Sequence, residues 1–447
     1  MGRVIALRAP LAAVLAAAAV LLVPAAGALH ADVRAAAALN GLKVTGHRIT
    51  DASGKPVMLR GVNRSGTEYA CQQGWGIFDG PADAASVQAM TTWHINYVRV
   101  LLNEDCWLDI NGIDPSLAGT NYQTAIKDYV DLLNGHGIYV ELSLIFASPG
   151  THPADHQPAA PSSHSVTFWG SVAAYFKNFP NVFFGVWGEP AVDASCWLNG
   201  CGGVPFCTDF PACSTYITYT SSGSQALVTA IRNGGATQII SVPGINYAND
   251  LSQWLTYEPN DPLGQLIAEE HVYGDNDPCG AATALERNCL NTNTATLAAT
   301  VPVIFGETGE TVFSTECGSS NMQFLLPWAD AHNIGYAAWV WDAWSGDCLS
   351  LITDYYNGIP NTTDPAGTAY AQYIHDHLLA VTAGRTVAQA PTSTPGGRGT
   401  KPSASATPPP RLVPAVQVAP RSVAARIAIS PRALRMPPGF YRALTAA

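Results

Sequence analysis

The chain has 447 residues, 47% of them hydrophobic and 12% charged, and this balance excludes a wholly disordered protein. The net charge of −11 is unevenly spread, because residues 41–381 carry 10 basic and 32 acidic side chains. Such an acidic region repels nucleic acid and anionic membrane surfaces, so neither is expected as a partner. A neutral substrate suits this charge, although acidity also simply aids solubility.

Residues 1–30 have the pattern of a signal peptide. Arg3 and Arg8 precede an apolar run from Leu11 to Val23, and small residues follow it. The alternative is a membrane anchor, but the run is shorter than the roughly 20 residues that a span requires. We therefore expect cleavage on export, an extracellular protein, and no membrane insertion of the mature chain.

Eight short apolar or β-branched runs follow between residues 57 and 345, separated by stretches long enough for helices, which is typical of repeated βα units. The expected strands are Leu59–Asn63, Tyr97–Leu101, Ile138–Leu144, Val182–Trp187, Gln238–Pro243, Leu266–His271, Val303–Glu307 and Gly335–Trp339. The expected helices include Asp83–Trp93, Tyr122–Gly135, His164–Asn178, Thr215–Asn233 and Asn321–His332. Eight repeats without a Gly-x-Gly-x-x-Gly turn favour an α/β fold, a (β/α)8 TIM barrel over residues 41–381, rather than an open doubly wound sheet.

Two glutamates stand at corresponding strand ends. Glu189 follows the fourth run and Glu307 ends the seventh, so both are expected at the C-terminal mouth, where the chemistry of such barrels lies. Apolar walls disfavour a charged carboxylate and a neighbouring cation favours it, so the two can hold different protonation states. Glycosidic cleavage needs one acid for the departing oxygen and one carboxylate for the anomeric carbon. Either glutamate alone would be an ordinary loop residue.

Other strand ends carry side chains that suit a sugar site, although each also has a structural explanation. They are Asn63, Arg99, His271, Tyr273 and Trp339. An arginine and a tyrosine would keep a nucleophilic carboxylate ionised, and an indole offers a flat face to a pyranose ring. Further tryptophans lie in or near probable loops, namely Trp75, Trp107, Trp197, Trp254, Trp341 and Trp344. They either stack on successive sugars or form small cores within the loops.

Together these segments resemble glycoside hydrolase family 5, the cellulase and mannanase family, over roughly residues 41–381. The matching stretches, in the family's order, are LRGVN (59–63), YVRV (97–100), WGEP (187–190), HVY (271–273), VIFGE (303–307), GYAAW (335–339) and LITDY (351–355). The resemblance implies a retaining double displacement on a β-linked polysaccharide such as β-1,4-glucan or mannan. Glu189 would be the acid/base and Glu307 the nucleophile, with carboxyl groups about 5–5.5 Å apart.

Two positions depart from the family pattern. Gly188 stands where the family has an asparagine before the acid/base, and Leu142–Phe146 lacks the histidine that usually ends the third strand. The missing asparagine removes a hydrogen bond to the sugar 2-hydroxyl, which strengthens in the transition state. Asn246, after the fifth strand, and Asn103, after the second, are candidates to replace it. These departures motivate an alternative, a carbohydrate-binding barrel with impaired catalysis. An esterase is disfavoured because the chain lacks a Gly-x-Ser-x-Gly elbow.

Ten cysteines suit an exported chain, in which thiols pair under oxidising conditions. Four crowd between residues 196 and 213, where the absence of Cys-x-x-Cys spacing and of histidine argues against zinc. The others suggest three pairs, although spacing does not fix connectivity: Cys71 with Cys106, Cys279 with Cys289, and Cys317 with Cys348. We expect disulfides, no metal or other cofactor, and a monomer.

Residues 382–447 consist mainly of Pro, Ala, Ser, Thr and Arg, with nine basic residues and no acidic residue. Without a sustained apolar period, this segment is expected to be a disordered basic tail. It could hold the protein to an acidic cell envelope, or have no function.

Overall fold

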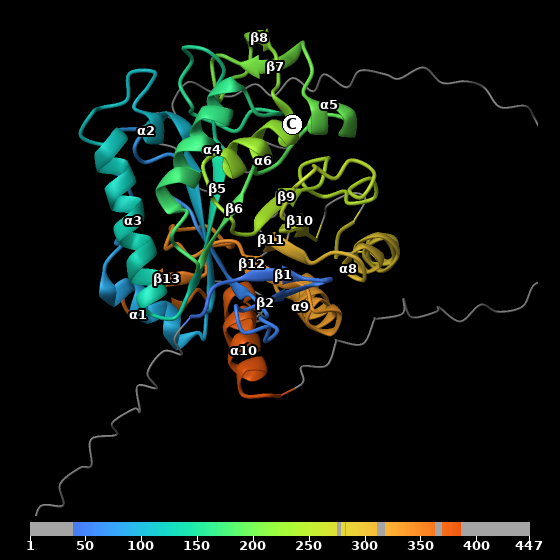
Figure 1. Ribbon diagram of the computed structural model, residues 1–447. Helices are drawn as coiled ribbons and strands as arrows, with labels where there is room; N and C mark the ends of the chain where they lie inside the picture. Colours follow the sequence, from blue (N-terminus) through green and yellow to red (C-terminus); the bar gives the residue numbers. More distant parts are fainter. Residues whose placement is uncertain (1–38, 275–278, 282, 311–317, 363–368, 386–447) are drawn as a thin grey trace, which may run out of the picture. The chain divides into compact units, whose positions relative to one another are not determined.

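The computed structural model describes residues 39–274, 279–281, 283–310, 318–362 and 369–385, and in it eight parallel strands close into a barrel (Figure 1). In chain order the strands are β3 (Arg60–Arg64), β4 (Tyr97–Asn103), β5 (Tyr139–Phe146), β6 (Val182–Gly185), β9 (Ile240–Pro243), β10 (Leu266–Tyr273), β11 (Val303–Gly309) and β12 (Gly335–Ala338). The last strand, β12, pairs with the first, β3, and so closes the barrel. Each strand overlaps its predicted run, and the predicted TIM barrel is confirmed.

Helices and short connecting elements follow the strands. The helices are α1 (Ala84–Thr92), α2 (Glu104–Leu108), α3 (Gly119–Gly135), α4 (Ser163–Phe176), α5 (Ala194–Asn199), α6 (Gly223–Asn233), α7 (Ala284–Cys289), the π-helix η1 (Leu290–Thr294), α8 (Ala295–Ala298), α9 (Ser320–His332) and α10 (Tyr370–Thr382). In the described part of the chain, short antiparallel hairpins are formed by β1 (Lys43–Thr45) with β2 (Arg48–Thr50), β7 (Val204–Cys207) with β8 (Tyr216–Tyr219), and β13 (Ile352–Asp354) with β14 (Ile359–Pro360).

One predicted helix, Thr215–Asn233, is wrong in its first half. Its residues Tyr216–Tyr219 form β8, which pairs antiparallel with β7, and α6 begins only at Gly223. The reason is local, because aromatic and β-branched residues favour a strand and a neighbouring strand was available to pair with them. Figure 1 shows this hairpin together with α5 at one end of the molecule, beyond α4 and α6.

The barrel interior changes from apolar to polar along the strands. At the N-terminal ends, an apolar layer is formed by the inward side chains of Leu59, Tyr97, Tyr139, Phe183, Ile239, Ile267, Ile304 and Ala337. The β1–β2 hairpin covers this layer through Val44. Because inward positions recur every two residues, the next layer contains Arg99, Glu141 and Glu269, all fully buried. Glycines make room for them, since a Cβ on Gly306 would lie 2.0 Å from Glu269 Oε1. A charged layer therefore lies directly beneath the mouth.

Disulfides tie down the loops around the barrel. The predicted pairs Cys71–Cys106 and Cys279–Cys289 are confirmed, and the clustered cysteines pair as Cys196–Cys201 and Cys207–Cys213. Cys348 is also disulfide-bonded, whereas its expected partner, Cys317, lies outside the described residues.

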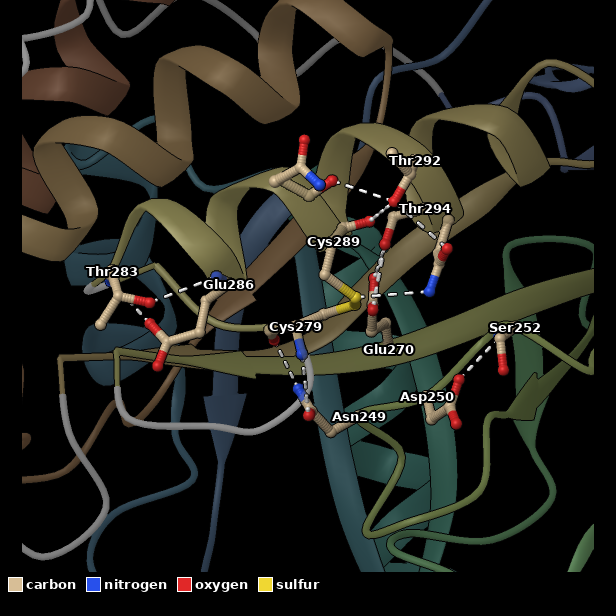
Figure 2. The surroundings of a disulfide bond; sticks show 12 residues. Asn249, Asp250, Ser252, Glu270, Cys279, Thr283, Glu286, Cys289, Thr292 and Thr294 are labelled. Carbon is tan, nitrogen blue, oxygen red and sulfur yellow. Dashed lines mark hydrogen bonds between the residues drawn. A yellow bond between two sulfur atoms is a disulfide. The ribbon is translucent and has the colours of Figure 1, made fainter. Parts of the chain in front are cut away.

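The Cys279–Cys289 disulfide lies against the strand that carries His271 (Figure 2). The Asn249 amide donates to the main-chain oxygens of Cys279 (2.6 Å) and His271 (3.1 Å). On the outer face of the same strand, the Thr294 hydroxyl donates a hydrogen bond that the two carboxylate oxygens of Glu270 share, at 3.1 and 2.9 Å. These contacts hold the end of β10 in place, and with it the histidine.

The expected signal peptide lies outside the described residues, as does the expected tail beyond residue 385. Helix α10 ends at Thr382, where that tail was predicted to begin. Within the described ranges, none of the helices combines the length and the apolar character that crossing a bilayer requires.

Candidate active site

The two glutamates predicted from the strand ends meet at the C-terminal mouth. One carboxylate oxygen of Glu189, one of Glu307 and a ring nitrogen of His271 all lie within 4.8 Å of one another. The side chain of Glu189 is 20% exposed and that of Glu307 is 8% exposed. Both carboxyl groups therefore face the same small space, and Glu189 is the one more open to solvent.

Glu307 is held by two donors at its two oxygens. Arg99 contacts Oε1 at 3.0 Å, and the Tyr273 hydroxyl donates to Oε2 at 2.8 Å. Burial raises the pKa of Glu307 above its ordinary value, whereas the cations His271 and Arg99 favour the ionised carboxylate. Its orientation is thus fixed from two sides before any substrate binds.

Asn63 orients the arginine. Its amide oxygen accepts from Arg99 at 3.0 Å, and its amide nitrogen donates to the main-chain oxygen of Gly306 at 3.0 Å. The predicted residue therefore belongs to the site, but it contacts the arginine and the backbone beside Glu307 rather than Glu307 itself.

His271 links the two glutamates to the charged layer below. Nδ1 lies 2.9 Å from Glu189, and Nε2 lies 3.2 Å from Glu269. Burial by itself would lower the pKa of His271, but the three surrounding glutamates raise it to about 9. The ring is therefore protonated at neutral pH and donates from both nitrogens.

The sequence prediction missed Glu269 and Glu141, although the two-residue period of the strands could have found them. Glu269 stands two positions before His271 and pairs with Arg99 at 3.2 Å. Its pKa is lowered, because Arg99 and His271 outweigh the opposing effect of burial. Burial and the nearby Glu269 raise the pKa of Glu141 well above its ordinary value, and Tyr97 donates a hydrogen bond to it. Arg99 thus forms ion pairs with Glu141, Glu269 and Glu307.

The sequence model of the cellulase family, glycosyl hydrolase family 5, matches residues 50–345. The chain belongs to glycosyl hydrolase family 5. This is a family of glycosidases, enzymes that hydrolyse O-glycosyl bonds, and the predicted family is confirmed.

Two curated proteins are similar to parts of the chain. Endoglucanase 1 of Robillarda sp. (strain Y-20) is 28% identical over 198 residues, which are 40% of this chain and 44% of the relative. Endoglucanase A of Butyrivibrio fibrisolvens is 26% identical over 162 residues, which are 34% of this chain and 33% of the relative. The chain therefore matches less than half the length of either protein.

Solved structures of other glycanases share the fold. The β-glucanase SdGluc5_26A of Saccharophagus degradans has a TM-score of 0.54 at 19% identity, covering 78% of this chain and 96% of that one. The catalytic domain of the Thermobifida fusca endoglucanase Cel5A has a TM-score of 0.52 at 16% identity, covering 76% and 97%. At these identities the likeness establishes the family 5 barrel fold alone.

The two asparagines considered as replacements for the missing family asparagine lie in different surroundings. Asn103 is fully buried, and its amide nitrogen donates to the main-chain oxygens of Glu68 and Ala154. Its amide oxygen caps α2, so the Asn103 hypothesis is wrong because the side chain is already used. Asn246 is exposed on the loop after β9, where the next residue, Tyr247, donates its N–H to Pro190. Of the two, only Asn246 remains near Glu189 with its side chain at the surface.

Only some of the predicted tryptophans can offer a face to a sugar. Trp339 is half-buried at the mouth and packs with Trp344 against a small cluster that contains Tyr69 and Ile145. Trp75 is 56% exposed and meets Tyr69 edge to face. The stacking hypothesis is wrong for four others, whose indoles are buried in the core: Trp107, Trp197, Trp254 and Trp341.

Two groups of three potential metal ligands occur in the described part of the chain. One is the Glu189, His271 and Glu307 group of the mouth, and the other is Glu104, Asp105 and His164. In the second group, Glu104 accepts from the main-chain N–H of Ser148 at 2.7 Å and Asp105 accepts from that of Ala154 at 2.8 Å. The carboxylates of both groups thus already have hydrogen-bond partners within the protein.

Proposed function

We propose that this protein is an exported, retaining endo-β-glycanase that uses Glu189 as acid/base and Glu307 as nucleophile. The observation that carries the proposal is the spacing of the two carboxylates, whose nearest ligand oxygens lie within 4.8 Å. Retaining glycosidases have carboxyl groups about 5–5.5 Å apart, whereas inverting enzymes leave about 6.5–9.5 Å for a water molecule. The short spacing supports direct attack by one of the pair.

The surroundings of the two carboxylates suit different roles. In the first step, Glu307 attacks the anomeric carbon while Glu189 gives its proton to the departing oxygen, and a glycosyl-enzyme forms. Arg99 and Tyr273 keep Glu307 ionised and aimed, which suits a nucleophile. In the second step, Glu189 takes a proton from water, which attacks the same carbon and releases the sugar. The greater exposure of Glu189 suits this exchange with water.

The remaining predicted residues would bind or position the substrate. Trp339 would stack on a pyranose ring, because its half-buried indole lies at the mouth. His271 would orient Glu189 through the contact at Nδ1. Asn63 would hold Arg99, and Asn246 would form part of the outer rim. A protein with these parts needs no metal or other cofactor for the reaction.

The substrate is proposed to be a β-1,4-glucan or a mannan, bound as a polysaccharide or oligosaccharide. Support comes from the family itself and from the two curated relatives, both named endoglucanases. A related β-glucanase of Saccharophagus degradans was solved in complex with cellotetraose. The competing proposal, a sugar-binding barrel with impaired catalysis, is motivated by Gly188 in place of the family asparagine.

Turnover of defined glycans by the purified full chain tests the proposal. We expect hydrolysis of a glucan or mannan with β-anomeric product first seen by NMR, and labelling of Glu307 by a 2-fluoro-sugar inactivator. Glu307→Gln should lower kcat by at least about 10³-fold while oligosaccharide binding is retained, because only the nucleophile is lost. Binding without any turnover or labelling in the wild type would establish the binding barrel instead, and α-anomeric product would exclude retention.

The export of the protein and its organisation are also proposals. Residues 1–30 would be removed on secretion, residues 41–381 would form the catalytic domain, and residues 382–447 would form a basic extension. Mass spectrometry of the protein from culture medium should find a start near residue 30. Light scattering should give the mass of a monomer.

A further inference from the structure

The space above Gly188 is filled by a side chain from another loop. A Cβ at this buried glycine would lie 2.2 Å from Gln157 Oε1 and 3.1 Å from Gln157 Cδ. The distance of 2.2 Å is far shorter than any real Cβ contact, so the Gln157 amide occupies the place in which a side chain at position 188 would begin. An amide therefore lies beside Glu189, although the residue before Glu189 has none.

A hydrogen bond fixes the direction of this amide. Gln157 Nε2 donates to the main-chain oxygen of Glu189 at 2.8 Å, which leaves Oε1 directed over Gly188. Within the described residues, none donates a hydrogen bond to Oε1, and the Gln157 side chain is only partly buried. The oxygen is thus oriented by the protein and available to a hydroxyl group from outside.

The loop that carries Gln157 is anchored on both sides of the site. The main-chain oxygen of His156 accepts from Ala147, at the end of β5, and that of Ala159 accepts from Ala191, after Glu189. The His156 ring stacks between Phe206 and Phe210, with ring centroids 4.7 Å apart in both cases. Since the loop is held at both ends, the amide needs little reorganisation when a sugar arrives.

We propose that Gln157 replaces the absent asparagine and binds the 2-hydroxyl of the sugar that Glu307 attacks. This inference rests on the proposed glycanase function and names a substrate-binding residue for it. As positive charge develops at the anomeric carbon, the adjacent 2-hydroxyl becomes a stronger donor, and its bond to an amide oxygen strengthens. Gln157 would therefore contribute more to the transition state than to the bound ground state. The change at position 188 is thus compensated by Gln157, which stands 32 positions before Glu189 in the chain.

A comparison of two substrates with two enzymes tests the contact. The substrates are an aryl β-bioside of the preferred sugar and its analogue without the 2-hydroxyl at the reacting ring. For the wild type, removal of the hydroxyl should lower kcat/KM by about 10- to 100-fold. Gln157→Ala should lose a similar factor on the intact substrate, mainly in kcat, and lose almost nothing more on the analogue. Asn246→Ala tests the competing asparagine and should keep the full hydroxyl effect, whatever change it causes in overall turnover.

A transplanted amide gives a second, independent measurement. Gly188→Asn alone should be poorly active, because its side chain would collide with Gln157. The double change Gly188→Asn with Gln157→Ala removes the collision with Gln157 and leaves only the end of the Ile145 side chain, Cδ1 at 2.8 Å, to move aside. It should recover both activity and the 2-hydroxyl effect relative to Gln157→Ala. Melting temperatures of all variants separate lost folding from lost contact.

The possible outcomes distinguish this role from the function on which it depends. If the wild type shows turnover and the hydroxyl effect is equally large in Gln157→Ala, the role of Gln157 is overturned while the glycanase stands. If the effect disappears in Asn246→Ala instead, the contact belongs to Asn246. Absence of all turnover in the wild type would overturn both proposals.

Discussion

Replacing Glu269 by glutamine tests whether the charged layer beneath the mouth controls His271. The carboxylate of Glu269 lies 3.2 Å from His271 Nε2 and accepts a hydrogen bond from the Ser241 hydroxyl at 2.7 Å. Two opposite charges at this distance attract by about 5 kcal/mol at an effective dielectric constant of about 20. One pKa unit corresponds to about 1.4 kcal/mol, so even a third of this attraction would move the pKa of His271 by about one unit.

We expect Glu269→Gln to lower the pKa of His271 from about 9 toward its ordinary value of 6.5. The glutamine keeps the size of the side chain, and the remaining glutamates still favour the charged ring. The variant should also lose about 3 kcal/mol of unfolding free energy, because Arg99 loses a buried partner at 3.2 Å. The conserved shape makes a loss of charge, rather than a cavity, the cause of both effects.

NMR titration of the chain labelled with 13C at histidine measures this pKa directly, with the His271 signal assigned by its absence from His271→Asn. The matched control is Glu270→Gln, the next residue on the same strand, which bonds to Thr294 on the outer face. That variant should change stability but leave the titration of His271 near its wild-type value. An unchanged His271 titration in Glu269→Gln would refute the role of Glu269.

Three further predictions concern the framework of the site. Gly306→Ala should lower the free energy of unfolding in urea by roughly 3 kcal/mol, because its Cβ would lie 2.0 Å from Glu269 Oε1. The control Gly135→Ala, whose Cβ would have nothing within 4 Å, should be neutral or stabilising by about 0.5–1 kcal/mol. Equal effects of the two changes would contradict crowding at Gly306. Burial raises the pKa of Glu104 and of Glu270 to about 8. Between about pH 4.5 and pH 8 these two carboxyl groups are therefore protonated in the folded state and ionised in the unfolded state. The melting temperature should therefore fall as pH rises over this range, and a rise would show that these groups are ionised throughout. Replacing Cys279 and Cys289, which stand 10 positions apart, by serine should lower the free energy of unfolding by about 3 kcal/mol. An unchanged unfolding midpoint would show that the loop is held by its other contacts.

Much of the barrel could be predicted because each strand is encoded locally. Continuous apolar runs such as Val182–Gly185 and Val303–Gly306 need burial on both faces, and residues that follow them directly must emerge at the same rim. For this reason Glu189 and Glu307 were found from the chain alone. The two-residue period of β10 also determines that Glu269, His271 and Tyr273 point inward, although only the latter two were recognised in advance.

Other features depended on contacts that local patterns do not encode. The stretch Tyr216–Tyr219 became a strand because β7 lies beside it, and four tryptophans assigned to loops turned out to be buried because neighbouring elements pack over them. The Asn103 side chain caps a helix and donates to two main-chain oxygens, contacts that the spacing of residues in the sequence does not reveal.

What the sequence alone determined is the order of the strands, the face on which each side chain stands and the rim at which the two glutamates emerge, because these follow from periodicities within short segments. Distances across the barrel were decided only by its closure, which brings Arg99 to Glu307 over 208 positions and leaves the gap above Gly188 to be filled by Gln157. The physical reason is that a side chain's neighbours through space depend on how all eight strands pack together, whereas its direction from the backbone depends only on the residues next to it.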